Sequence, residues 1–177
     1  LYISELARAA VDGEVDLSHE TPVTEAVADA IRSRLESLAP GVREVLDLAA
    51  CAETSVSAEV DALVLDRPVH DVEDAHDVAI SAGLLEVAPD SPGNVRFVHR
   101  VVADVVYDEI APRRRARLHG AIAAALEADA GDQAHRYAPL LARHYSLSAR
   151  SQTAALRWFR IAAAQANAVL DHREALH

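Results

Sequence analysis

The chain has 177 residues, of which 51% are hydrophobic, and it carries 17 Lys and Arg residues against 28 Asp and Glu residues. This length suffices for one domain, or two small ones, with a buried core. The formal net charge of −11 disfavours nucleic acids and anionic membrane surfaces as partners, because the mean surface field repels phosphate groups. Aromatic residues make up only 4% and Met is absent, a composition that suits closely packed helices with small contact residues. We therefore expect a mainly α-helical protein.

The sequence contains neither a run of ~18 apolar residues nor a basic segment followed by an apolar one. We therefore expect a cytoplasmic protein with no membrane partner. Cys51 lies in the apolar run 45–52 and is predicted to be a small buried hydrophobic residue. Because the sequence begins at Leu1 within a pattern and stops at His177 with a helical pattern still running, we expect an internal fragment of a larger protein.

The first predicted element is a short helix over 1–10, followed by the acidic, glycine-broken segment 11–16. Thr21 and Pro22 are typical of an N-cap and a first helical position. An amphipathic helix should follow, with apolar residues at 3.6-residue spacing: Val23, Val27, Ala30, Ile31, Leu35 and Leu38. The next helix, from Pro40 to Ala52, is apolar on nearly every side and is predicted to lie centrally in the core.

Two shorter helices are predicted next. Ser57 is expected to cap the first of them and Asp71 the second, and Gly83 is expected to end the second in the left-handed conformation. Both helices together have the order of a helix-turn-helix pair.

Beyond Gly83 the apolar period changes to two residues. Alternating positions over 85–87 and 95–97 flank the turn-rich run 89–94, which predicts a β-hairpin. Three helices followed by a hairpin favour a winged helix, in which the hairpin covers an apolar face that the helices leave open.

Four further helices are predicted at 101–110, 112–130, 133–148 and 152–170. The last has an alanine-rich contact stripe, which lets antiparallel helices approach closely: Ala155, Leu156, Phe159, Ala162, Ala163, Ala166 and Val169. The predicted fold is therefore a winged helix followed by an antiparallel helical array.

A search for catalytic patterns finds no glycine-rich phosphate loop, no GxSxG elbow and no HExxH sequence. None of the nine histidines has a recognised metal-ligand spacing to a Cys or carboxylate. We therefore expect no catalytic residues and no metal site.

The charge of its second helix decides whether the helix-turn-helix is expected to bind DNA. The predicted recognition helix, 71–78, carries four acidic residues and no Lys or Arg, so it would lose the counterion-release energy on which DNA affinity depends. Direct binding of nucleic acid is therefore disfavoured. The basic run 113–117 suggests either an acidic partner or a solvated face that pairs with nearby carboxylates.

His99 follows the second hairpin strand, where a strand gives way to a helix. On spacing alone, a lone histidine at a strand end is a hydrogen-bonded structural residue.

Several segments together carry a resemblance over nearly the whole chain. They are, in order, 27–40, 45–50, 82–85, 95–107, 113–115, 118–119, 141–145 and 155–159. The chain resembles the region after the ATPase core in bacterial STAND-type (AAA/NB-ARC-like) regulators, notably large LuxR-type ones. The most specific similarity is the F-x-H…Y…R-R…L-H order, formed by Phe97, His99, Tyr107, Arg113–Arg114 and Leu118–His119.

The resemblance implies three regions: 1–20 as the tail of the ATPase lid subdomain and a linker, 21–111 as the winged helix, and 112–177 as a truncated tetratricopeptide-like arm. ATP or ADP would bind to a nucleotide-binding domain upstream in the same chain, and this fragment alone would hold no cofactor. His99 matches the histidine with which relatives contact the β-phosphate of ADP. Arg100 stands where the best-known M-H-D form of this motif has aspartate.

The resulting hypothesis is a non-catalytic signal-transducing fragment of a transcriptional regulator. Its winged helix would latch the ADP state, and its helical arm would relay the signal of a protein or small-molecule inducer. A tetratricopeptide-type interaction scaffold is the first alternative, and a DNA-binding winged helix is the second.

Overall fold

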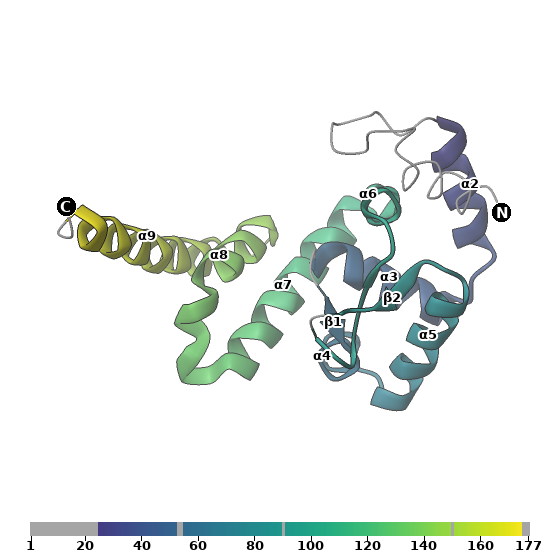
Figure 1. The fold of residues 1–177 in the computed structure, drawn as a ribbon, viewed down its shortest axis with the longest axis horizontal. Coiled ribbons are helices and arrows are strands. Elements are labelled where there is room, and N and C mark those ends of the chain that lie inside the picture. Colours follow the sequence, from purple (N-terminus) through teal and green to yellow (C-terminus); the bar gives the residue numbers. More distant parts are fainter. Residues whose placement is uncertain (1–24, 53–54, 90, 150, 175–177) are drawn as a thin grey trace. The chain divides into compact units, whose positions relative to one another are not determined.

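The computed structural model describes residues 25–52, 55–89, 91–149 and 151–174. It is mainly helical, with a small antiparallel sheet of three strands (Figure 1). The chain divides into two compact units, residues 1–38 and residues 39–177. The predicted helix over 1–10, the acidic segment and the Thr21–Pro22 cap lie outside the described residues.

Helix α2, Glu25–Glu36, is the described element of the first unit. Ile31 and Leu35 are buried, as the amphipathic pattern predicted, and so is Ala28, whereas Ala30 of that pattern is exposed. On the exposed face Arg32 donates a hydrogen bond of 2.7 Å to Asp29, three residues earlier on the helix.

Helix α3, Pro40–Ala52, is the central helix of the second unit, which confirms its prediction. Every residue from Val45 to Ala52 is buried, and the helix contacts α4, α5, α6, α7 and β3. Such burial needs side chains without charge, and Asp47 is the exception within α3.

Helices α4, Ala58–Leu65, and α5, Val69–Ser81, pack against each other. The Ser57 hydroxyl accepts a hydrogen bond of 3.3 Å from the Val60 N–H, so the predicted cap is confirmed. The prediction that Asp71 caps α5 is wrong. The N-cap is Pro68, three residues earlier, with φ of −59° and ψ of 141°, and the Asp71 N–H donates to the Pro68 carbonyl.

The end of α5 follows the prediction. Gly83 has a φ of +66°, a conformation that costs glycine little. The Leu84 N–H bonds the Ala79 carbonyl and the Gly83 N–H bonds the Ile80 carbonyl, the two hydrogen bonds of a Schellman motif.

The predicted β-hairpin is confirmed by strands β2, Leu85–Val87, and β3, Asn94–Phe97. A third strand, β1, Val56–Ser57, pairs antiparallel with the other edge of β3, giving the order β1-β3-β2. Strand β1 could not be predicted, because two residues cannot show an alternating pattern.

Four helical elements follow the sheet and precede the last helix α9, Gln152–Glu174. They are α6, Arg100–Glu109; α7, Pro112–Ala130; η1, Gly131–Tyr137; and α8, Ala138–Leu147. The helix predicted over 133–148 is therefore divided into a 3₁₀ segment and an α-helix. Pro139 favours this division, because proline has no N–H to donate and suits the first turn of a new helix.

Helices α7, α8 and α9 and the 3₁₀ segment η1 share a core of mostly small residues around one large aromatic side chain. Its buried members are Ala123, Ala134, Ala138, Leu141, Ala142 and Trp158. Helix α7 also contacts α3 and α4, so residues on both sides of the predicted boundary at 111/112 belong to one compact unit.

Candidate functional site

His99 lies between the end of β3 and the start of α6. The Val98 N–H donates to the Leu84 carbonyl at 3.1 Å, which ties this junction to the buried residue before β2. His99 itself is the N-cap of α6, with extended backbone angles of −136° and 136°. Its carbonyl accepts the Val102 N–H at 3.0 Å, so the helix begins directly beyond it.

The His99 side chain is half-buried and makes no capping hydrogen bond to α6. The first N–H groups of a helix have no intrahelical acceptor, and they carry the positive end of the helix dipole. Arg100 follows directly, and its side chain is 93% exposed. An imidazole, a helix N-terminus without a side-chain cap and an accessible guanidinium are therefore adjacent in the chain, a combination suited to an anion.

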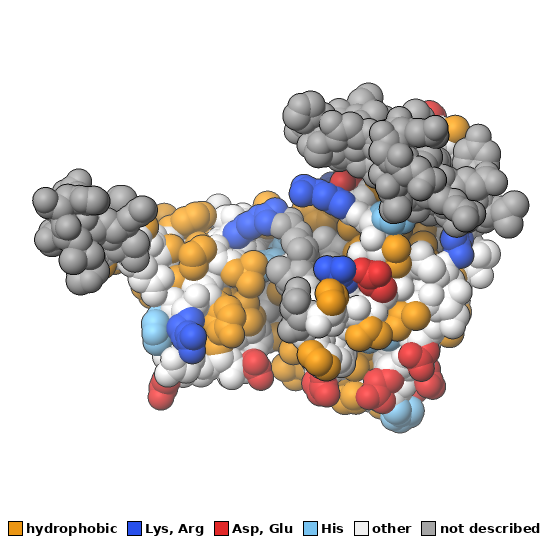
Figure 2. Space-filling view, in the orientation of Figure 1, with side chains coloured by type: hydrophobic (Ala, Val, Ile, Leu, Met, Phe, Trp, Pro, Cys, Tyr) orange, Lys and Arg blue, Asp and Glu red, His pale blue; other side chains and the backbone are white. Residues whose placement is uncertain are grey.

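The exposed face of α5 is acidic, as predicted. Glu73, Asp74 and Asp77 are exposed on this helix, which has no Lys or Arg. Figure 2 shows acidic side chains gathered over the part of the surface where α4 and α5 lie in Figure 1. Such a face repels the phosphates of a DNA backbone.

Two arginines of the basic run 113–117 have partners within the chain. Arg115 lies over the ring of Tyr107, 4.7 Å from its centroid, and its Nη1 is 3.9 Å from Asp108. Arg114 donates a hydrogen bond of 2.9 Å to Asp47. The sequence left two interpretations of the basic run, an acidic partner or pairing with nearby carboxylates. For these two side chains the structure favours the pairing.

Asp47 joins two distant parts of the second unit. Its side chain is 8% exposed and accepts hydrogen bonds from Arg43 at 3.0 Å and Arg114 at 2.9 Å. Arg43 belongs to the same helix, whereas Arg114 lies in the first turn of α7, 67 residues further along. A buried carboxylate is costly unless it is paired, and here two guanidinium groups compensate it.

A chain of polar groups crosses from α6 to α8 through α7. The Tyr107 hydroxyl lies 3.1 Å from His119 Nε2, and His119 Nδ1 lies 2.9 Å from His144 Nδ1. His119 and His144 are 1% and 2% exposed. The sequence did not predict this pairing, because the two residues are 25 positions apart and no motif spacing connects them.

The surroundings of this pair oppose protonation. Burial, followed by the charge of Arg115, lowers the pKa of His119. Burial, followed by the charges of His119 and Arg143, lowers the pKa of His144 to about 4. Both imidazoles are therefore neutral at pH 7, and one ring donates its Nδ1 proton to the other.

A second buried pair holds α4 against α5. His76 Nε2 lies 2.9 Å from Asp61 Oδ2, and both side chains are buried. Burial raises the pKa of Asp61 and outweighs the opposing hydrogen bond and charge of His76. Both helices carry these residues on the faces that meet, so this pair is structural.

Neither a metal centre nor a reactive thiol emerges from the described residues. No group of three His, Cys, Asp or Glu side chains among them could hold a metal ion. Cys51 is fully buried and free, as predicted, and burial together with Asp47 raises its pKa to about 12. No helix in the described part is both long and apolar enough to cross a membrane.

Comparisons of the chain with protein-family models, with curated proteins and with solved structures found no match.

Proposed function

We propose that this chain is a non-catalytic regulatory region of a STAND-type ATPase, in which residues before α7 form a winged helix that holds an upstream nucleotide-binding domain in its ADP state. The observation that carries this proposal is the place of His99, at the N-cap of α6 with no capping hydrogen bond from its side chain. The resemblance of 95–107 to the family motif assigns the phosphate contact to this same histidine.

The order of elements supports the winged helix. Helices α3, α4 and α5 precede the β2–β3 hairpin, and α3 contacts both β3 and α6. The hairpin thus helps to cover the central apolar helix, as a wing does.

The chemistry of the junction suits a diphosphate. An imidazole N–H donates a charge-assisted hydrogen bond to phosphate oxygen, and the start of α6 adds a favourable dipole. A contact made in only one arrangement of the domains shifts the population toward that arrangement. His99 would therefore stabilise the closed, ADP-bound state, and the helical arm α7–α9 would relay an inducer signal that releases it.

The acidic face of α5 argues against the DNA-binding alternative. A gel-shift titration of this chain with duplex DNA at low and high salt tests it directly. We expect no salt-dependent complex, because Glu73, Asp74 and Asp77 occupy the helix that would enter the major groove.

A protein-interaction scaffold is the second candidate, and α9 provides the observation in its favour. Leu156 and Phe159 are 59% and 49% exposed on this helix, an apolar surface of the kind that partner helices cover. The latch and the scaffold make different predictions about the sequence upstream of this chain in the parent protein. A phosphate-binding loop upstream of Leu1 supports the latch, and its absence supports the scaffold.

The proposed latch is tested by the nucleotide content of the intact parent protein. We expect the wild type to retain ADP through purification and His99→Ala to lose most of it. His70→Ala is the matched control, because His70 is an exposed histidine of α5. Equal ADP content in all three proteins would remove the proposed role of His99.

A further inference from the structure

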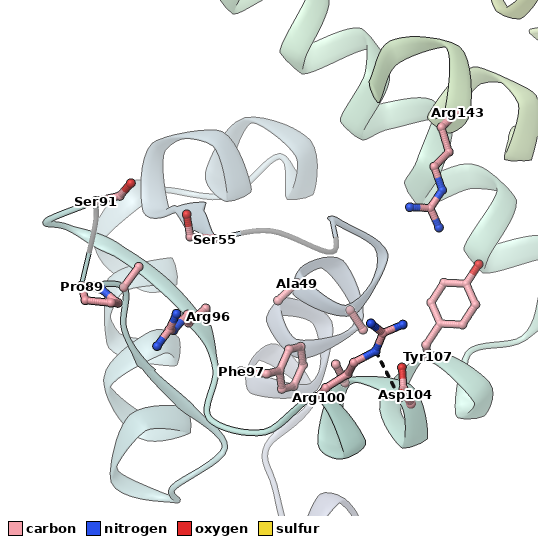
Figure 3. A pocket seen from close by; sticks show the side chains of 13 residues that line it. Ala49, Ser55, Pro89, Ser91, Arg96, Phe97, Arg100, Asp104, Tyr107 and Arg143 are labelled. Carbon is pink, nitrogen blue, oxygen red and sulfur yellow. Dashed lines mark ion pairs between the residues drawn. The ribbon is translucent and has the colours of Figure 1, made fainter. Parts of the chain in front are cut away.

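A cavity of about 860 Å³ opens between the sheet, α3, α6 and α8 in the second unit (Figure 3). Its apolar wall consists of small side chains of α3 and α6 together with the ring of Phe97. Tyr107 completes this wall toward α8. The volume lies in the range of small-molecule sites, ~300–1,000 Å³.

The polar lining of this cavity is basic. Among the described residues, Arg96 from β3, Arg100 from α6 and Arg143 from α8 line it, against the single carboxylate of Asp104. Acidic residues outnumber basic ones in the chain, 28 to 17, so three arginines around one cavity reverse the balance of the whole sequence. A cavity with this lining attracts anions.

Arg96 and Arg100 differ in how firmly a carboxylate holds them. Arg96 is fixed by Glu86, with Nε and Nη2 at 2.8 Å and 2.7 Å from Oε1. Arg100 lies 3.8 Å from Asp104, a loose ion pair on a side chain that is 93% exposed, so it can turn toward a ligand at little cost. Figure 3 shows Arg143 extending from α8 toward Tyr107, on the side of the cavity where Arg100 lies.

We propose that this cavity binds an organic anion, with a carboxylate or phosphate head between Arg100 and Arg143 and an apolar body against Phe97 and the small side chains of α3. Guanidinium groups match both heads in geometry, because each can donate two parallel hydrogen bonds. The bound head bridges α6 and α8, so occupancy stabilises the arm against the helix whose N-cap is His99. The inference does not rest on the proposed nucleotide latch.

The test is an NMR titration of the ¹⁵N-labelled chain with three probes that share one apolar body: 2-naphthoate, 2-naphthyl phosphate and uncharged 2-naphthol. We expect both anions to shift the amide signals of residues 96–107 and 141–145, and naphthol to bind at least tenfold more weakly. The two anionic probes distinguish a carboxylate ligand from a phosphate ligand by their relative affinities.

Substitutions complete this test. Arg100→Gln and Arg143→Gln should each weaken binding of the tighter anion about tenfold, whereas Arg136→Gln, an exposed arginine of η1 outside the cavity, should leave it unchanged. Arg100 is so exposed that its replacement should not disturb folding, which keeps the test valid if Arg143→Gln unfolds. Equal binding of naphthol, shifts confined to other residues, or unchanged affinity in Arg100→Gln would each overturn the proposal.

Discussion

His119 and His144 face each other with their Nδ1 atoms 2.9 Å apart, inside the contact between α7 and α8. At that distance one nitrogen must donate and the other accept, so the pair cannot be doubly protonated without breaking its hydrogen bond. Arg115 and Arg143 add positive charge nearby, and the Tyr107 hydroxyl lies 3.1 Å from His119 Nε2. The packing of the helical arm therefore depends on two neutral histidines.

The first prediction concerns the pH dependence of stability. Between the ordinary histidine pKa of 6.5 and the folded value of about 4 for His144, the unfolded chain binds a proton that the folded chain does not. The free energy of unfolding should therefore fall as pH drops through this window, with a contribution from His144 of at most about 3 kcal/mol. Urea denaturation at pH 7.5 and pH 5 measures the difference.

A variant isolates the contribution of the pair. In His144→Gln the fall in stability between pH 7.5 and pH 5 should be smaller than in the wild type, because glutamine does not titrate. His135→Gln, which replaces an exposed histidine of η1, should keep the wild-type difference. Identical pH dependence in wild type and His144→Gln would contradict this account of the buried pair.

The second prediction concerns the link between α3 and α7. Asp47→Asn keeps the shape of the side chain but removes the charge that binds Arg43 and Arg114. We expect a loss of about 2 kcal/mol in the free energy of unfolding, because the buried hydrogen bonds from the two guanidinium groups lose their charge-assisted character. Arg113→Gln, at an exposed neighbour of Arg114, should change stability by less than ~0.5 kcal/mol.

The third prediction compares two adjacent aromatic residues of α9. Trp158 is 5% exposed, packs in the α7–α9 core and donates from its ring N–H to Glu127 at 3.3 Å, whereas Phe159 is 49% exposed. Trp158→Ala should cost ~3–5 kcal/mol of stability and Phe159→Ala less than a third of that. Thermal and urea denaturation of the two variants give the comparison, and similar losses in both would contradict the burial of Trp158 in this core.

The fourth prediction concerns the thiol. Cys51 is fully buried, and its pKa of about 12 leaves almost no thiolate at pH 8. A thiol reagent such as Ellman's should therefore label the native chain far more slowly than the chain in denaturant. Rapid labelling in both conditions would show that α3 is not central.

Much of the local structure could be predicted because it depends on local patterns. The Ser57 cap, the end of α5 at Gly83 and the hairpin around 89–94 each depend on residues within one turn or one strand, and the structure has all three. The prediction of Asp71 as a cap was wrong because Pro68 is the N-cap of α5, and residue preferences alone did not distinguish the two positions.

The tertiary polar contacts could not be predicted. Asp47 and Arg114 are 67 residues apart, and His119 and His144 are 25 apart, so their meeting depends on how α7 packs against α3 and α8. The resemblance to a family motif pointed to His99 as a site residue, and the structure shows that it is the N-cap of α6. The cavity arginines come from three different elements, and no spacing rule connects them.

The rate at which the intact parent protein releases ADP tests the central claim most directly. A fluorescent ADP analogue is bound to the wild type, His99→Ala and His70→Ala, and its displacement by excess unlabelled ADP is followed. The account predicts release at least tenfold faster from His99→Ala and unchanged release from His70→Ala. Equal release rates from the wild type and His99→Ala would contradict it.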